Sequence, residues 1–189
     1  FEARAREDAA WCRYGLESGS YLLVTLHRPS NVDSPEGLTR IVRLLLESAR
    51  RLPVLFTVHP RTKASLERMG RWQELEQTAA LHLLPPLAYP EFLSLNLGAR
   101  AVLTDSGGVQ EETTALRVPC LTLRPNTERP VTVTEGTNLL VSDDVDRQLA
   151  TLDQLLEGRL VPRGTVPEFW DGAAGGRIRD VLVRWFRPE

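Results

Sequence analysis

The sequence predicts an α/β fold, built as a doubly wound parallel sheet of about six strands with helices on both faces. Two observations carry this prediction. Short apolar runs recur along the chain, as in strands that are buried on both faces, and helix-period patterns separate these runs. The length of 189 residues, with 42% apolar and 25% charged residues, suits a single domain, 1–189.

The first half of the chain alternates between the two patterns. Apolar residues at helical spacing predict a leading helix within residues 1–18. Ser34 and Pro35 form a typical helix start and predict a helix to about residue 49. A further helix is expected over residues 62–77, with a break at Gly70. Continuous apolar runs predict strands over residues 21–26, 54–58 and 81–84.

The second half repeats the alternation. Strands are expected over residues 101–104, 120–123 and 139–141. Helices are expected over residues 90–97, 109–116 and 145–156, with a closing helix within 173–187. Right-handed crossovers then leave few topologies, and the strand order 3-2-1-4-5-6 of a Rossmann-like sheet is the natural one.

Charge and cysteine content exclude several classes of protein. A formal net charge of −2 gives no electrostatic reason to expect nucleic acid or an anionic membrane as a partner. No apolar run approaches the roughly 20 residues of a membrane span. Cys12 and Cys120 are far apart in the sequence, which offers no zinc pattern and no disulfide framework, so we expect no metal and a cytoplasmic location. The chain begins with Phe1 rather than Met, and we expect it to be a piece of a longer protein.

Two strand ends stand out as the expected ligand site. In a sheet of this order, ligands bind at the carboxyl ends of strands 1 and 4, where the winding reverses. Strand 1 ends at His27 and Arg28, and strand 4 runs into Ser106, Gly107 and Gly108 at a helix start. Glycines let a ligand approach the backbone, and the free N–H groups of the helix start favour a phosphate. A tight turn with no ligand is the alternative.

Further candidates lie on the same rim. Glu112, expected with Glu111 in the first helical turn, could accept hydrogen bonds from ribose hydroxyls, or could serve only as a partner of the helix dipole. His27 and His59 at two strand ends have structural roles as alternatives. Arg129 could bind phosphate or pair with Glu128 or Glu135.

Phe92 is the candidate for a base-binding side chain. It follows the third predicted strand at the start of a short helix, where its ring could offer a face to a nucleobase. A core role is the alternative reading of this position.

Four motifs together resemble the non-hydrolysing UDP-N-acetylglucosamine 2-epimerases. They are Thr-Leu-His-Arg (25–28), Val-His-Pro-Arg (58–61), Thr-Asp-Ser-Gly-Gly-Val-Gln-Glu-Glu (104–112) and Thr-Glu-Arg-Pro (127–130). Their order and spacing match that family from about Ser20 to the end of the chain, and Gly136-Thr137-Asn138 and Trp170-Asp171-Gly172 add to the likeness.

The resemblance implies the second, UDP-binding domain of a glycosyltransferase-B-type fold. It implies that His27 lies by the diphosphate and takes part in catalysis, and that Ser106, Gly107 and Gly108 hold phosphate. By the same likeness Glu112 binds ribose, Phe92 and the backbone of Leu87 meet the uracil, and Arg129 belongs to the substrate site. Arg28 and His59 resemble residues of a second, regulatory UDP-sugar site.

The implied reaction is the interconversion of UDP-GlcNAc and UDP-ManNAc at C2, by elimination and re-addition of UDP, with no cofactor. The implied partners are UDP-GlcNAc or UDP, the missing N-terminal domain with most of the acid/base carboxylates, and a second copy in a homodimer. Two departures stand out: residues 29–33, Pro-Ser-Asn-Val-Asp, replace the commoner continuation, and Leu87 stands where some members have Gln. The rival functions are a glycosyltransferase half and a stand-alone nucleotide-binding module.

Overall fold

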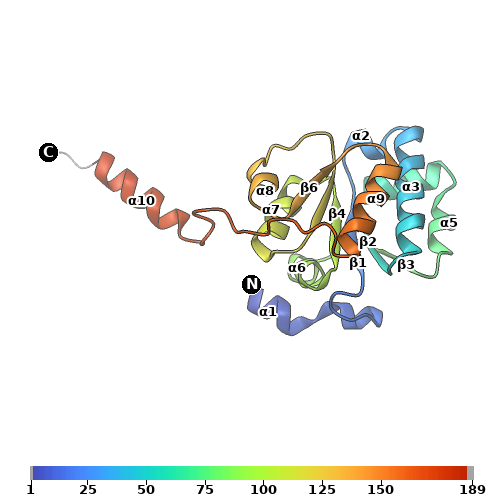
Figure 1. Ribbon diagram of the computed structural model, residues 1–189, viewed down its shortest axis with the longest axis horizontal. Coiled ribbons are helices and arrows are strands. Elements are labelled where there is room, and N and C mark those ends of the chain that lie inside the picture. The colour runs from blue at the N-terminus through green and yellow to red at the C-terminus, as the bar shows by residue number, and fades with distance from the viewer. Residues whose placement is uncertain (1, 187–189) are drawn as a thin grey trace.

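The computed structural model describes residues 2–186 and contains one six-stranded parallel sheet (Figure 1). Its strands lie in the order β3-β2-β1-β4-β5-β6, which confirms the predicted sheet and its topology. The strands are Leu22–Thr25 (β1), Val54–Thr57 (β2), Leu81–Leu84 (β3), Ala101–Thr104 (β4), Cys120–Leu123 (β5) and Asn138–Val141 (β6). All five strand pairs are parallel.

Helices cover both faces because successive strand residues point to opposite sides. Leu22 and Val24 of β1 pack into one core, while Leu23 between them packs into the other. The first core is covered by α3 (Pro35–Ala49), α4 (Pro60–Arg68), α5 (Trp72–Glu76) and α9 (Val145–Leu156). The second core is covered by α6 (Tyr89–Gly98) and α7 (Gly107–Leu116). These layers leave the carboxyl ends of the strands as one uncovered edge.

Most helix predictions are confirmed, and the differences lie near chain reversals. The helix predicted over 62–77 is broken around Gly70, as expected, into α4 and α5. The leading helix is two pieces, α1 (Glu2–Asp8) and a 3-10 helix (Ala10–Tyr14), because Ala9 adopts a left-handed conformation with φ of 42°. Two four-residue helices that the sequence analysis missed are α2 (Pro29–Val32) and α8 (Val131–Thr134).

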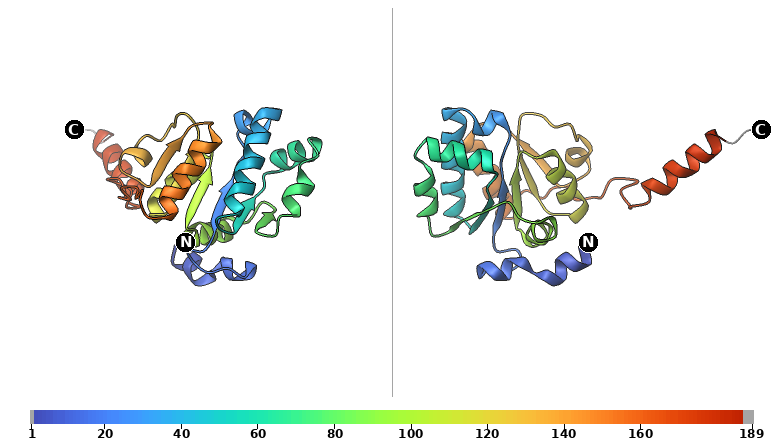
Figure 2. Two further views of the ribbon diagram at one scale, coloured as in Figure 1. Left: turned by 45° about the vertical axis from the view of Figure 1, so that its right-hand side comes forward. Right: turned by 180° about the vertical axis from the view of Figure 1, so that it is seen from behind.

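Helix α10 (Ala174–Trp185) forms close to its predicted bounds but does not close the domain. Figures 1 and 2 show it standing away from the sheet at the end of an extended segment. None of its residues is buried in the described structure, and Ile178, Val181, Leu182 and Trp185 are exposed. The ends of the two predicted terminal helices, Phe1 and Arg187, lie outside the described residues. Among residues 2–186, no helix is both long and apolar enough to cross a membrane.

Candidate functional site

The sheet brings the two polar strand ends together. β1 and β4 are neighbours, with Thr25 in register with Thr104, so His27 and Asp105 leave the sheet side by side. The winding reverses between these strands, where a doubly wound sheet opens a crevice for ligands. The predicted juxtaposition of His27 with Ser106 and Gly107 therefore follows from the strand order.

Helix α7 begins with unpaired backbone donors. The amide of Gln110 is the first to reach back along the helix, to the carbonyl of Ser106 at 3.3 Å, so the amides of Gly107, Gly108 and Val109 precede the helical ladder. Within residues 2–186 the Ser106 side chain caps none of them. A Cβ atom on Gly107 would meet no described atom within 4 Å, so the space above these amides is open. Such an end attracts anions, and phosphate above all.

Asp105 is the organising residue beside this helix start. Its side chain is fully buried, and it accepts hydrogen bonds from the backbone amides of His27 (3.1 Å) and Arg28 (2.9 Å) and from Nδ2 of Asn31 (2.9 Å). Burial raises the pKa of Asp105, but hydrogen bonds from His27, Asn31 and the Arg28 backbone outweigh it and leave the pKa lowered. Asp105 is thus an anion that pins the turn after β1.

His27 stands between this carboxylate and solvent. Its Nδ1 lies 3.2 Å from Oδ1 of Asp105, and its side chain is 40% exposed. The hydrogen bond to Asp105 raises the pKa of His27 despite partial burial, which favours the imidazolium form. The ring of His59, at the end of β2, lies 5.8 Å away between centroids. The Nδ1 atom of His59 accepts a hydrogen bond from the amide of Arg61 and caps α4.

A network of charges borders the site after β5. Glu128 accepts two hydrogen bonds from the nearly buried Arg124, at 2.6 and 2.8 Å, and two longer ones from Arg28 at 3.3 Å. The hydrogen bonds from Arg124 lower the pKa of Glu128 to about 2. Arg28 also donates from Nε to the carbonyl of Asp105. The guanidinium groups therefore hold the loop after β5 against the turn after β1.

Arg129 pairs with a different acid from those expected. Its Nε lies 2.9 Å from Glu111 of α7, rather than from Glu128 or Glu135, because the loop after β5 runs alongside α7. Its side chain remains about half exposed. Arg129 thus lies against the helix that begins with the open amides.

Glu112 lies in the second turn of α7, not the first as predicted, because the helix begins at Gly107. Its Oε2 atom is buried with no hydrogen-bond partner among residues 2–186. Burial, followed by the charge of Glu111, raises the pKa of Glu112. The charge of Glu112 also raises the pKa of Tyr89, after burial of that phenol, so the start of α6 lies near this carboxylate. A buried acceptor without a donor is costly, and a ligand hydroxyl would satisfy it.

Leu87 lies just before α6, and Phe92 lies within its first turns. Both are partly buried and pack against the second core, so each has a structural role.

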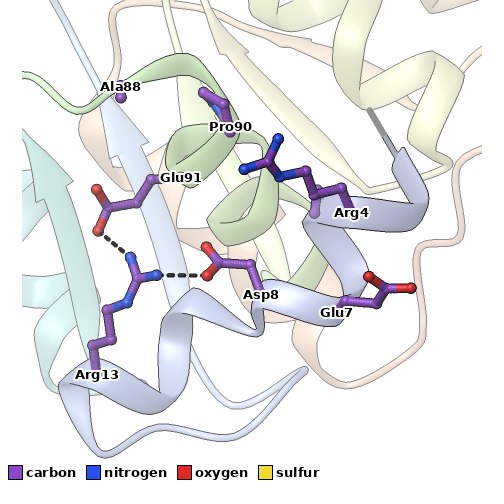
Figure 3. A pocket seen from close by; sticks show the side chains of 8 residues that line it. Arg4, Glu7, Asp8, Arg13, Ala88, Pro90 and Glu91 are labelled. Atoms are coloured by element: carbon purple, nitrogen blue, oxygen red, sulfur yellow. Dashed lines mark hydrogen bonds and ion pairs between the residues drawn. The ribbon is translucent and has the colours of Figure 1, made fainter.

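A separate pocket of about 480 Å³ opens between α1 and the start of α6 (Figure 3). Arg13 spans it with hydrogen bonds to Asp8 and Glu91, so its charge is already neutralised. None of the predicted nucleotide-binding residues lines this pocket; its lining is Arg4, Ala5, Glu7, Asp8, Arg13, Ala88, Pro90 and Glu91.

Sequence reasoning missed the roles of Asp105, Asn31 and the pair of Arg124 with Glu128. Asp105 stands between a strand and a glycine turn, a position that reads equally well as an exposed loop acid. Its burial depends on the turn after β1 lying over its carboxylate, and no local pattern around Asp105 indicates those contacts. Within the described chain, no cluster of three or more His, Cys, Asp or Glu side chains could hold a metal ion.

Comparison with known proteins gives a consistent assignment. The family model described as UDP-N-acetylglucosamine 2-epimerase matches residues 2–183. The chain is 40% identical over 165 residues to the UDP-N-acetylglucosamine 2-epimerase of Methanocaldococcus jannaschii, covering 86% of this chain and 44% of that protein. It is 36% identical over 177 residues to the UDP-2,3-diacetamido-2,3-dideoxy-D-glucuronate 2-epimerase of Pseudomonas aeruginosa, covering 90% and 46%.

A solved structure agrees with these relatives. The Methanocaldococcus jannaschii UDP-GlcNAc 2-epimerase in complex with UDP-GlcNAc and UDP superposes with a TM-score of 0.80 at 35% identity, over 96% of this chain and 50% of that one. The chain therefore spans about half the length of the relatives it matches. Sequence, fold and family model agree, and the chain belongs to the UDP-N-acetylglucosamine 2-epimerase family.

Proposed function

We propose that this chain is the UDP-sugar-binding half of an enzyme that interconverts UDP-GlcNAc and UDP-ManNAc at C2, by elimination and re-addition of UDP. The observation that carries the proposal is the uncapped start of α7, which lies beside His27 at the switch point of the sheet. Membership of the epimerase family and the bound ligands of the solved relative support it.

The diphosphate binds at Ser106, Gly107 and Gly108. The amides of Gly107, Gly108 and Val109 precede the helical ladder and, with the positive end of the helix dipole, suit its charge, whereas the Ser106 amide already donates to Oγ1 of Thr104 at 3.0 Å. The hydrogen bond to Asp105 raises the pKa of His27, and in its protonated form His27 adds a positive charge where the C1–O bond of the sugar breaks. Stabilising the departing UDP is the part of the reaction that this half performs.

The nucleoside lies between α6 and α7. Glu112 accepts hydrogen bonds from the ribose hydroxyls, which would satisfy its unpaired buried oxygen. Phe92 lines the uracil pocket and the backbone of Leu87 contacts the base. This placement is supported by their positions, Phe92 within α6 and Leu87 just before it, since the start of α6 is near Glu112.

The remaining candidate residues divide between the substrate site and a second site. Arg129 belongs to the substrate site, and in the chain without ligand Glu111 holds its guanidinium beside α7. Arg28 and His59 are the candidates for a second, regulatory UDP-sugar site. Both already have partners in this chain, Glu128 and the amide of Arg61, which such a ligand would have to displace.

The other half of the enzyme supplies the groups that remove and return the proton at C2. Two features support a missing partner: the chain spans about half of its relatives, and the large apolar side chains of α10 are exposed in the part of the chain that the structure describes. A homodimer is the larger assembly we propose. The two free cysteines, Cys12 and Cys120, fit the reducing conditions of the cytoplasm.

The substitution Gly107→Val tests the phosphate site directly. A Cβ atom at Gly107 meets no described atom within 4 Å, so we expect the fold to be retained while the valine methyl groups occupy the space that the diphosphate needs. UDP affinity, measured by calorimetry on the 189-residue chain, should fall at least tenfold, about 1.4 kcal/mol.

Gly176→Val in α10 is the matched control, because it also introduces a valine into open space. It should leave UDP affinity unchanged. Equal affinities of a folded Gly107→Val variant and the unmodified chain would remove the phosphate site from α7.

A further inference from the structure

The two histidines of the site use their ring nitrogens in opposite ways. Nδ1 of His27 faces the buried carboxylate of Asp105 at 3.2 Å, and a carboxylate with a lowered pKa can only accept. Nδ1 of His27 must therefore carry a proton. Nδ1 of His59 accepts a hydrogen bond from the amide of Arg61 and so carries none.

The two rings are neighbours, with centroids 5.8 Å apart. Nδ1 of His59 caps α4, whereas Nδ1 of His27 faces Asp105. The charged groups around the pair are Arg28 beside His27 and Arg124 beside Asp105, with Glu128 between these two guanidinium groups.

Asp105 itself is unusually well fixed for a group on a rim. It is fully buried and receives hydrogen bonds from two backbone amides and the side chain of Asn31. Its carboxylate therefore cannot turn away from Nδ1 of His27 without leaving several donors unpaired. Its contact with Nδ1 therefore also fixes the ring of His27. Nε2 is the ring nitrogen that does not contact Asp105.

We propose that Asp105 is a positioning residue for His27, which it holds with Nδ1 protonated so that the Nε2 proton is available to the diphosphate of a UDP-sugar. Asp105 acts through the imidazole and does not touch the ligand. The proposal rests on the proposed function for the identity of the anion, but the state of the His27 ring is a property of the free chain.

The first test needs no substitution. Nitrogen-15 NMR of the imidazole rings in the free 189-residue chain identifies which ring nitrogen keeps its proton when each histidine is neutral. We expect Nδ1–H for His27 and Nε2–H for His59. An Nε2–H form of neutral His27 would overturn the proposal, even if UDP binds as expected.

The second test compares Asp105→Asn with Asp153→Asn. Asp153 also forms an ion pair, with Arg51 between α9 and α3, but lies away from this edge of the sheet. The hydrogen bond to the Asp105 carboxylate raises the pKa of His27. Asp105→Asn removes the negative charge of that acceptor and should lower the pKa of His27, whereas Asp153→Asn should leave it unchanged. An unchanged His27 pKa in folded Asp105→Asn would contradict the proposal.

The pH dependence of UDP affinity completes the test. The protonated form of His27 binds the anion, so affinity should decline as the pH rises through the His27 pKa, and Asp105→Asn should move this decline to lower pH. A purely structural role of Asp105 would weaken binding equally at every pH and would contradict the proposal. Absence of UDP binding to the unmodified chain, with the expected ring states, would instead count against the proposed function alone.

Discussion

The 189-residue chain alone, incubated with UDP-GlcNAc, is expected to form no UDP-ManNAc. Epimerisation needs groups on both sides of the sugar to remove and return the C2 proton, and under the proposed function this half contributes only the UDP-binding side. An open half-site also leaves the sugar in water, which weakens every electrostatic contact at the reacting bond. Proton NMR of the sugar, which distinguishes the two C2 epimers, is the measurement.

The protein that contains both halves is the control for this experiment. It should convert UDP-GlcNAc with no acceptor present, whereas a glycosyltransferase would require one. The Pseudomonas aeruginosa relative is named for a different UDP-sugar, a diacetamido glucuronate, and that sugar should be offered in parallel. Sustained conversion by the 189-residue chain alone would place the acid/base groups within it and contradict the division between the halves.

His27→Asn in the protein with both halves is expected to lower turnover at least tenfold, toward the range of roughly 10²–10⁴ found for positioned acid–base groups. Asparagine can still donate to Asp105 but cannot carry the positive charge that the departing UDP requires. Steady-state kinetics and a thermal unfolding curve should be measured together, so that a loss of turnover is separated from a loss of fold.

His82→Asn is the matched control for this substitution. His82 lies within β3, partly buried, with its ring packed edge-on against Tyr14 at 6.3 Å between centroids. Turnover of this variant should stay near that of the unmodified enzyme. A normal turnover number for a stable His27→Asn enzyme would return His27 to a structural role at the end of β1.

The sequence predicts the sheet well because the central strands are mostly buried and mostly apolar. Leu22, Leu23 and Val24 are all fully buried, and a continuous apolar run of this kind indicates a strand that is buried on both faces. The strand order then places His27 beside Ser106 with no further information. The break at Gly70 is equally local, since this glycine has a φ of 66° and ends the turn between two helices.

Other features depend on contacts between distant parts of the chain. Asp105 could be recognised from the sequence only as part of the motif over residues 104–112, because no local feature indicates that its carboxylate is buried under the turn after β1. Arg129 pairs with Glu111, 18 positions away, rather than with its sequence neighbours. The apolar residues of α10 read as a closing helix, yet in this chain they face solvent.

Backbone amide NMR of the 189-residue chain during a titration with UDP would show directly whether the diphosphate binds at the start of α7, because it locates the ligand residue by residue. We expect the largest chemical-shift changes at the amides of Gly107, Gly108 and Val109, since phosphate oxygens would accept hydrogen bonds from these unpaired donors. Saturable shifts confined to Asp8 and Arg13, in the pocket beside α1, with α7 unmoved, would contradict it.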